Sequence, residues 1–487
     1  MLDALPAVGV PADQVLDELK ALRRGDLPTH GGRLFAYVYD PAIPGLDTLA
    51  VTAYALSAHV NGLDPLAFPS LLATENALVA AAARVLGAGP GTSAPEVVGS
   101  VTSGGTESLI LAVKAARDSR PEIERPRLVV PVTAHAAFAK AAHYLDVELD
   151  LVPVDADFRA DPTAMAAAIG PDTVLVACSA PSYAHGVVDP VAEIAAAAAE
   201  RGVRCHVDAC FGGWVLPYLK RLGAALPDFD FSVAGVTSIS VDLHKYAYCP
   251  KGVSVLLHRD ADLRRPQYFA FADWPGYTMI NPGISSTRSG GPVAAAYATL
   301  RHIGDEGYLR LASQTQEAVR GLAAAVTATD GLRLLAPANT TVVCMTSTDP
   351  GLDLFVLADA LAAADWHTQP QLPFGEMPTS IHLTVTAAVL PKVAEFAVAL
   401  TAAANAARAI GPVTLPPDLV AMTAALTPDQ LTPELVAGIA STFGLGEESS
   451  EPPRMAMVNA LLAVAPARLR EQLLVEFVSL LQRPSFT

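Results

Sequence analysis

Lys245 is the residue of this sequence best suited to covalent chemistry. It lies in the segment SVDLHKYAYCPKG (residues 240–252), between two apolar runs that have the length of buried strands. Burial disfavours the charged form of a lysine, and the free amine can then form a Schiff base with a carbonyl compound. His244, directly before it, could donate a hydrogen bond to a phosphate. The structural alternative is a lysine that extends its charged end to solvent, which is the commoner role for an isolated His-Lys pair.

A second motif, VTSGGTESLILAVK (residues 101–114), has the pattern of an anion-binding turn. An apolar strand runs into Gly104 and Gly105, and Thr106 then begins a helix. Free backbone N–H groups and the positive end of the helix attract a phosphate, and the hydroxyls of Ser103 and Thr106 add donors. The spacing is neither GxxxxGK[ST] nor GxGxxG, which excludes a P-loop and a dinucleotide fingerprint. An ordinary capped turn is the alternative.

Two further side chains follow apolar runs. Asp208 ends the run VRCHV, where a buried carboxylate needs a cationic or proton-bearing partner. His135 lies in the loop before the helical stretch AFAKAAHYL, where its ring could stack on a flat cofactor. Each has a simpler interpretation, since Asp208 could cap the next helix and His135 could be a polar surface residue.

Taken together, in their order along the chain, the four motifs supply what pyridoxal 5'-phosphate (PLP) requires. They provide a phosphate cradle, a ring-stacking histidine, an acid for the pyridine nitrogen and a Schiff-base lysine. An ionised Asp208 would keep the ring nitrogen protonated, so that the ring acts as an electron sink. The sequence therefore predicts a PLP enzyme that carries its cofactor on Lys245.

The elements that must position these residues follow an α/β pattern. Between residues 61 and 304, apolar runs of about five to seven residues alternate with amphipathic helical stretches. This pattern predicts a large domain with a mostly parallel sheet covered on both faces, with ligands at the carboxyl ends of its strands. Residues 305–487 predict a smaller α+β domain, and residues 1–60 a helical and irregular N-terminal segment.

Composition limits the class of protein. Of the 487 residues, 52% are hydrophobic and 17% charged, which indicates a large buried core. The net charge of −17, without a cluster of Lys or Arg, argues against a nucleic-acid surface. Apolar stretches are interrupted by turn residues and the first residues include acids, so we expect neither a membrane span nor a signal peptide but a cytoplasmic protein. The five cysteines lack zinc or CxxC spacing, and we expect no metal site.

Five segments resemble the sphingosine-1-phosphate lyase branch of the group II PLP-dependent decarboxylase family: TSGGTES, TAHAAFAKAAHY, SAPSYAHGVVD, HVDACFGG and GVTSISVDLHKYAYCPKG. The resemblance runs in order from roughly residue 30 to the C-terminal helix. It implies a fold type I homodimer with active sites at the subunit interface. It also implies that Lys245 holds the cofactor, His244 and the Gly105–Thr106 turn bind its phosphate, His135 stacks on the ring and Asp208 pairs with its nitrogen.

The same resemblance assigns further residues. Ser182 and Tyr183 of SAPSY would lie beside the cofactor on the substrate side. Gly290 and Gly291 of STRSGG would approach the phosphate from the partner subunit, although relatives carry Ser-Arg-Pro-Gly-Gly at this motif. Lys251 of CPKG remains a candidate for binding a substrate phosphate or for acid–base chemistry.

The substrate side departs from the family pattern. In the segment NGLDPLAFPS, which begins at Asn61, Asp64 takes the place of a histidine that relatives carry in Leu-His-Pro-Asp. An acid there would repel a substrate phosphate by ~1 kcal/mol or more at close range. Tyr39 of AYVYD, chosen over Tyr37, is a further substrate-side candidate.

Three functions are compatible with these residues. The first is a lyase that opens the Cα–Cβ bond of a β-hydroxy amine, with or without a phosphate, and releases an aldehyde and an amine. The second is α-decarboxylation of an amino acid, which the acid at Asp64 favours. The third is a PLP-binding dimer without catalysis, which would need Lys245, Asp208 or His135 to be missing, and all three are present.

Overall fold

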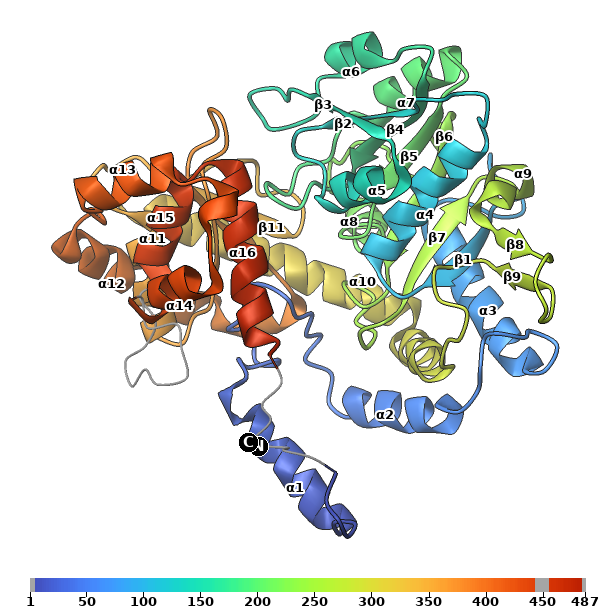
Figure 1. Ribbon diagram of the computed structural model, residues 1–487, viewed down its shortest axis with the longest axis horizontal. Coiled ribbons are helices and arrows are strands. Elements are labelled where there is room, and N and C mark those ends of the chain that lie inside the picture. The colour runs from blue at the N-terminus through green and yellow to red at the C-terminus, as the bar shows by residue number, and fades with distance from the viewer. Residues whose placement is uncertain (1–4, 443–454, 484–487) are drawn as a thin grey trace.

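A computed structural model describes residues 5–442 and 455–483. Figure 1 shows a large α/β domain and a smaller domain that are connected by a long helix, with an N-terminal helix projecting from the body of the molecule. The N-terminal helix, α1 (Ala12–Leu22), contains no buried residue. Residues 1–4 and 484–487, at the outer ends of the predicted N-terminal segment and C-terminal domain, lie outside the described residues.

The large domain is built on a seven-stranded sheet with the order β1-β7-β6-β5-β4-β2-β3. β7 is antiparallel to both of its neighbours, and the other neighbouring pairs are parallel. Every residue of β4 and of β7 is buried, as expected for a sheet covered on both faces. The predicted, mostly parallel sheet is therefore confirmed. The strands are β1 (Val98–Thr102), β2 (Arg127–Pro131), β3 (Glu148–Val152), β4 (Thr173–Ser179), β5 (Arg204–Asp208), β6 (Val236–Asp242) and β7 (Ser254–His258).

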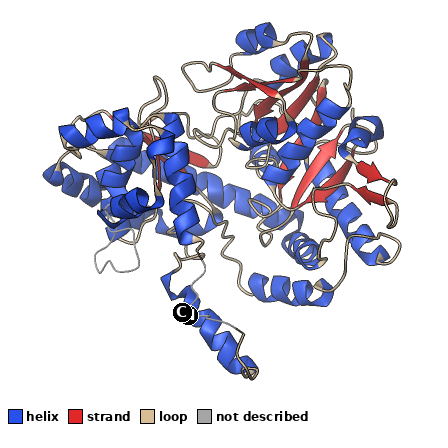
Figure 2. Ribbon diagram, in the orientation of Figure 1, coloured by secondary structure: helices blue, strands red, loops and turns tan. Residues whose placement is uncertain are grey.

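Helices cover both faces of this sheet (Figure 2). Alternation along β2 shows the two layers: Leu128 and Val130 join the core that contains α4 and α5, whereas Val129 joins the core that contains α6 and α7. This period of two is the geometry of a strand with a buried surface on each side. The helices of this domain are α2 (Leu46–Ser57), α3 (Pro69–Val85), α4 (Gly105–Asp118), α5 (Ala137–Leu145), α6 (Pro162–Ala168), α7 (Val191–Glu200), α8 (Leu216–Arg221) and α9 (Ala261–Arg264).

Helix α10 (Gly291–Ala328) connects the two domains. It bends at Gly304, whose φ of 65° lies in the left-handed region that glycine tolerates. Before the bend, Val293 and Ala296 pack in the core of the large domain, and after it Val319 and Leu322 pack in the core of the small domain. A short hairpin, β8 (Phe269–Phe271) and β9 (Met279–Asn281), precedes this helix.

The small domain is an antiparallel four-stranded sheet packed against helices. Its core includes Phe35, Trp366 and Phe396, whose rings contact one another at centroid distances of 5.1–5.9 Å. Phe35 comes from the N-terminal segment, which therefore completes this core. In sheet order the strands are β10 (Leu332–Leu334), β11 (Val342–Ser347), β13 (Ser380–Thr384) and β12 (Gln369–Gln371), and the helices are α11 (Leu354–Ala363) and α12 (Val393–Ile410).

The chain ends in a helical unit with its own small core. Leu431, Val436, Ala465 and Leu469 form its buried cluster. The helices of this unit are α13 (Pro417–Ala425), α14 (Pro433–Thr442), α15 (Met455–Val464) and α16 (Ala467–Leu481), and the short 3-10 helices of the chain are η1 (Arg23–Gly25), η2 (Arg265–Gln267), η3 (Ala387–Lys392) and η4 (Pro428–Gln430).

One described helical stretch, Ala387–Ile410, has the length and apolar composition that a membrane crossing needs. Phe396, Leu400 and Ala404 of this stretch are fully buried in the core of the small domain, which is the place of a core helix. The five cysteines are buried and free. Within residues 5–442 and 455–483, no group of three or more His, Cys, Asp or Glu is arranged to hold a metal ion.

Candidate active site

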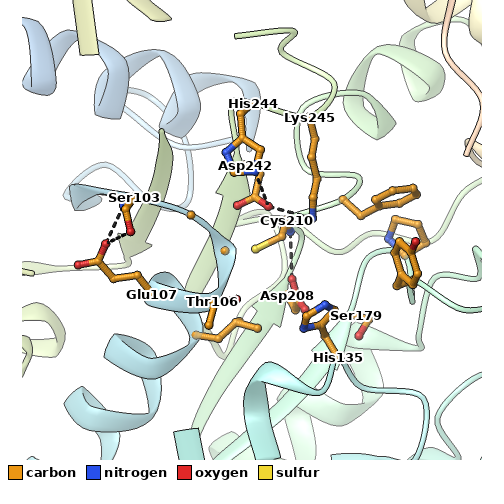
Figure 3. Close-up of a pocket in the computed structure, with 16 residues that line it drawn as sticks. Ser103, Thr106, Glu107, His135, Ser179, Asp208, Cys210, Asp242, His244 and Lys245 are labelled. Carbon is orange, nitrogen blue, oxygen red and sulfur yellow. Dashed lines mark hydrogen bonds and ion pairs between the residues drawn. The ribbon is translucent and has the colours of Figure 1, made fainter. Parts of the chain in front are cut away.

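A cavity of about 430 Å³ opens at the carboxyl ends of β4, β5 and β6. These strands end in Ser179, Asp208 and Asp242, and all three side chains line the cavity because the strands are parallel neighbours. Figure 3 shows the residues of the cavity wall. Nine of the residues predicted from the sequence meet there: Ser103, Gly104, Gly105, Thr106, His135, Tyr183, Asp208, His244 and Lys245.

The glycine turn between β1 and α4 forms one wall of the cavity. Gly104 precedes the helix, and the first helical hydrogen bond runs from the N–H of Ser108 to its carbonyl (3.1 Å). The N–H groups of the first turn therefore precede the helical hydrogen-bond ladder and are available to an anion. A Cβ atom added to Gly105 would lie 2.8 Å from Sγ of Cys210 and 2.9 Å from Oδ2 of Asp242, so only glycine fits at this position.

Glu107 stabilises this turn, a role that the sequence analysis did not assign. Its carboxylate accepts hydrogen bonds from the N–H (2.7 Å) and hydroxyl (2.6 Å) of Ser103 and from the N–H of Ile284 (2.8 Å). The hydroxyl of Ser103 is therefore engaged by Glu107, which leaves the hydroxyl of Thr106 as the free side-chain donor expected at the turn. A Glu three residues into a helix is a familiar capping position, and this spacing could have indicated the contact.

Lys245 forms an ion pair with Asp242, with 2.8 Å between Nζ and Oδ2, and its Nζ lies 5.6 Å from the ring centroid of Phe211. Burial opposes the charged form of Lys245, but Asp242 outweighs burial and raises the pKa of this amine above its usual value. The expectation that burial alone would neutralise Lys245 is therefore wrong, because Asp242 pairs with the amine. The amine must leave this ion pair before it can react as a nucleophile.

Asp242 is the main functional candidate that sequence reasoning missed. Its side chain is 2% exposed, and its Oδ1 accepts a hydrogen bond from the hydroxyl of Ser254 (2.5 Å). Burial opposes ionisation, but the charges of Lys245 and His244 keep the pKa of Asp242 below its usual range. The signal was present, because Asp242 ends an apolar strand just as Asp208 does.

Asp208 and His135 occupy the part of the wall farther from the glycine turn (Figure 3). Asp208 is buried, and its Oδ1 accepts the N–H of Cys210 (3.1 Å). Nδ1 of His135 accepts the N–H of Ala137 (3.1 Å), so in the neutral ring the hydrogen resides on Nε2. The His135 ring meets Tyr183 edge to face at 6.4 Å.

The substrate-side predictions divide into residues of the wall and residues behind it. Tyr183 lines the cavity and stacks on His382 at 4.5 Å, and burial raises the pKa of its phenol. Tyr39 lies behind Phe211, with the Nζ of Lys251 5.1 Å from its ring centroid, and neither Tyr39 nor Lys251 is part of the cavity wall.

Ser182 is the one SAPSY residue whose expected position differs from the structure. It is buried, its hydroxyl has no hydrogen-bond partner among the described residues, and it does not line the cavity. The chain turns after β4, so that Ser179 and Tyr183 face the cavity and Ser182 faces the interior.

The remaining predicted residues lie away from this cavity within one chain. Asn61 lines a second cavity of about 320 Å³, together with Arg288. Asp64 is exposed, and its Oδ1 accepts the N–H groups of Leu66 (2.8 Å) and Ala67 (3.3 Å). The pair at the start of α10 packs against other parts of the chain, since the N–H of Gly290 donates to Val60 (2.8 Å) and a Cβ atom on Gly291 would contact Tyr54.

The residues of the cavity fit PLP. An amine, a turn with free N–H groups, an imidazole and a buried carboxylate line one space. Lys245 would hold the aldehyde carbon, the Gly104–Gly105 turn with His244 the phosphate, and Asp208 the ring nitrogen. The glycine at position 105 lets this turn pack directly against Cys210 and Asp242, because a Cβ atom there would lie within 3 Å of both side chains.

Comparison with family models gives two matches. Residues 29–347 match the pyridoxal-dependent decarboxylase conserved domain, which covers the cavity and the whole large sheet. Residues 417–480 match the C-terminal putative HTH domain of pyridoxal-dependent enzymes, which corresponds to the helical unit α13–α16.

Comparison with individual proteins gives relatives along most of the chain. The sphingosine-1-phosphate lyase of Arabidopsis thaliana is 37% identical over 419 residues, which cover 85% of this chain and 75% of that protein. A sphingosine-1-phosphate lyase structure from Burkholderia pseudomallei is 35% identical with a TM-score of 0.77, and the match covers 84% of this chain and 94% of that one. A probable L-tyrosine/L-aspartate decarboxylase of Methanothermobacter thermautotrophicus is 34% identical over 275 residues, which cover 56% of this chain and 74% of that protein.

Proposed function

The chain belongs to the pyridoxal-dependent decarboxylase family and, within it, to the sphingosine-1-phosphate lyases, and from this premise we propose the reaction that it catalyses. The substrate is a phosphorylated β-hydroxy amine with a long chain, of the sphingosine-1-phosphate type. Cleavage of its Cα–Cβ bond gives a long-chain aldehyde and phosphoethanolamine. The observation that carries the proposal is the placement of Lys245, Asp208, His135 and the glycine turn around one cavity, in a chain similar to these lyases along most of its length.

The residues at the cofactor each have a defined task. When bound, PLP supplies an electron sink for the negative charge that develops at the substrate Cα. The buried carboxylate of Asp208 would hold a proton on the ring nitrogen, which keeps this sink effective. His135 would cover one face of the ring, and the glycine turn with His244 would bind the phosphate.

Two side chains of the wall are suited to proton transfer. Cleavage needs a base for the β-hydroxyl proton and a donor for Cα. Nζ of Lys245, where it is not bound to the cofactor, would be placed to accept a proton, because its ion pair with Asp242 raises the pKa of this amine. Burial keeps the phenol of Tyr183 protonated at neutral pH, so its Oη is suited to donate.

The phosphate of the substrate, which is carried on the carbon next to Cα, would extend toward Lys251 and Tyr39 behind the cavity wall. The ammonium of Lys251 lies over the Tyr39 ring, and burial lowers its pKa. A cation at this place is suited to a substrate phosphate. Within one chain, the carboxylate of Asp64 is exposed, caps its own turn and does not line the cavity, so its charge does not oppose a phosphate there.

We also propose that the enzyme is a homodimer. Aromatic and aliphatic side chains are exposed over α2, the start of α3 and the β8–β9 hairpin, close to the predicted partner-facing Gly290 and Gly291. Apolar surfaces of this extent on a soluble protein mark an interaction site. The exposed side chains are Val51, Tyr54, Leu56, Leu66, Phe68, Leu72, Phe269, Phe271, Trp274, Tyr277, Ile280 and Ile284.

Product analysis separates the lyase from the decarboxylase. The holoenzyme is incubated with sphingosine-1-phosphate and, separately, with a panel of amino acids that includes tyrosine and aspartate, and products are identified by mass spectrometry. We expect a long-chain aldehyde together with phosphoethanolamine. Release of carbon dioxide and an amine from an amino acid, without cleavage of the phosphorylated amine, would show a decarboxylase instead.

A further inference from the structure

One proton of the His244 ring is fixed by its hydrogen bond. Nδ1 lies 3.0 Å from the carbonyl oxygen of Val253, and a carbonyl oxygen can only accept a hydrogen bond. Nδ1 therefore carries a hydrogen. In a neutral imidazole with this hydrogen, Nε2 has a lone pair and no proton to donate.

The His244 ring lies beside the phosphate cradle, and its other nitrogen lies near an acid. A Cβ atom added to Gly104 would lie 3.8 Å from Cε1 of His244, which places the ring beside the glycine turn. Nε2 lies 3.7 Å from Oδ2 of Asp242. A phosphate in this turn offers acceptors, so Nε2 can donate to it only if the ring carries both protons.

Asp242 is built to support that second proton. Its Oδ1 is occupied by the hydroxyl of Ser254, and its Oδ2 faces two cationic groups, Lys245 at 2.8 Å and His244 at 3.7 Å. The carboxylate is 2% exposed, and a buried carboxylate requires a compensating charge. Covalent attachment of the cofactor engages the amine of Lys245, and among the described residues His244 is the other ion-pair partner of Asp242.

We propose that Asp242 is a positioning residue that holds His244 with both ring nitrogens protonated, so that Nε2 donates to the cofactor phosphate and cofactor binding takes up one proton. The inference rests on the PLP site of the proposed function, but it is independent of the substrate. It explains why a carboxylate stands directly beneath an anion-binding turn, where it would otherwise repel the phosphate.

The charges around His244 set the direction of the pH dependence. Burial lowers the pKa of the His244 imidazole, and the positive charges of Lys251 and Lys245 lower it further. The carboxylate of Asp242 acts in the opposite direction and raises the pKa of His244. On α4, the carboxylate of Glu107 is turned onto Ser103. A bound phosphate adds negative charge beside Nε2, so the pKa of His244 is higher in the complex than in the free protein. The protein should therefore bind phosphate with full affinity at pH values below the pKa that His244 has in the free protein. The affinity falls as the pH rises toward the pKa that His244 has in the complex.

Pyridoxine 5'-phosphate is the probe that isolates this contact. It lacks the aldehyde and cannot attach to Lys245, and pyridoxine without the phosphate serves as the ligand control. Titration calorimetry on the cofactor-free protein at pH 7.5, in buffers with different ionisation enthalpies, gives both the Kd and the number of protons taken up. We expect close to one proton for the wild-type protein, close to zero for His244→Gln, and no His244-dependent uptake with pyridoxine.

A double-mutant cycle tests the role of Asp242. A carboxylate at this range shifts a neighbouring pKa by about one unit or more, so Asp242→Asn should weaken binding about tenfold where His244 is present. In the His244→Gln background the same substitution should leave binding unchanged or tighten it, because only the repulsion is removed. A purely structural role would weaken binding in both backgrounds.

Three outcomes would overturn the proposal. These are equal proton uptake by wild type and His244→Gln, equal weakening by Asp242→Asn in both backgrounds, and a full proton uptake retained by Asp242→Asn. Circular dichroism establishes that each variant is folded. If Asp242→Asn does not fold, Asp242→Glu, which keeps the charge and moves it, takes its place and should lower the proton count below one.

Discussion

The chemistry depends on a few charged side chains whose states are set by their neighbours. Lys245 retains its proton because Asp242 lies 2.8 Å away, although the lysine itself is largely buried. Three acids approach the cavity, and each has a different environment: Asp208 accepts a backbone N–H, Asp242 faces two cations, and Glu107 is turned onto the glycine loop. The roles we assign follow from these environments more than from residue type.

Asp208 should affect turnover more than cofactor binding. Asp208→Ala removes the carboxylate that would hold the proton on the ring nitrogen. We therefore expect kcat to fall roughly a hundredfold or more, which corresponds to a rise of about 2.7 kcal/mol in the activation free energy. Steady-state kinetics of the PLP-saturated variant measure this, and Asp208→Glu, which keeps the acid, should recover part of the rate. Near-normal turnover of Asp208→Ala would refute the assignment.

Lys251 should affect substrate binding without affecting the cofactor. Lys251→Ala removes a cation at the expected substrate end, so we expect KM for a phosphorylated substrate to rise about tenfold, with PLP affinity unchanged. Lys251→Arg, which keeps the charge, should restore much of the loss. An unchanged KM in Lys251→Ala would mean that the substrate phosphate is bound elsewhere.

At the scale of the elements, strand ends and one turn decide the site. β4 and β5 end at the paired residues Ser179 and Asp208, and β6 continues past Ser240, the partner of Asp208, to Asp242. The α4 turn brings backbone donors to the same place. These are local features, and short sequence motifs encode them.

Gly105 should be irreplaceable in this turn. Gly105→Ala would bring a Cβ atom within 3 Å of Cys210 and Asp242, so we expect PLP affinity to fall at least tenfold and stability to fall by about 1–3 kcal/mol. Absorbance titration with PLP and thermal unfolding measure the two effects. Gly170→Ala is a matched control, because a Cβ atom there would meet nothing within 4 Å. Equal behaviour of the two variants would contradict the tight cradle.

The C-terminal helical unit gives no sign of a nucleic-acid surface. Residues 417–480 match a putative HTH domain, but this segment contains eight acidic and three basic residues. Surfaces that bind nucleic acids are basic, because they neutralise phosphates. The absence of a nucleic-acid partner stays a prediction, which the acidic composition of this unit favours.

The sequence indicated the fold and the centre of the site, and it missed what depends on side-chain direction. Lys245, Asp208 and His135 were predicted because each follows an apolar strand. Asp242 was missed because its effect arises from which side chains share one end of the sheet. Ser182 was placed at the cofactor by the family resemblance, but the chain turns after β4 and the structure puts Ser179 at the cavity instead.

At the scale of the whole molecule, the residues predicted for the substrate side come from distant segments of the chain. The N-terminal segment supplies Tyr39 and a residue of the small-domain core, while Asn61, Asp64, Gly290 and Gly291 lie outside the cavity of their own chain. Such placements depend on tertiary and quaternary packing, which short motifs do not encode. This is why the substrate end was the weakest part of the prediction.

The exposed apolar surface near the β8–β9 hairpin should hold two copies together. We expect sedimentation velocity to give twice the chain mass for the wild-type protein at micromolar concentration. Ile280→Asp, at a side chain that is 60% exposed on the hairpin, should shift the protein toward monomer because it buries a charge in the interface. Val398→Asp, at a side chain that is 73% exposed on α12, should leave the mass unchanged. A monomeric wild-type protein would contradict the dimer.

Peptide mapping after borohydride reduction tests the assignment of Lys245 most directly. The holoenzyme is reduced, digested and analysed by mass spectrometry, beside Lys245→Ala treated in the same way. We expect the reduced cofactor on the peptide that contains Lys245, no attached cofactor in the variant, and loss of the absorbance near ~420 nm together with activity. Cofactor fixed to another lysine, or a reducible band retained in Lys245→Ala, would contradict the site described here.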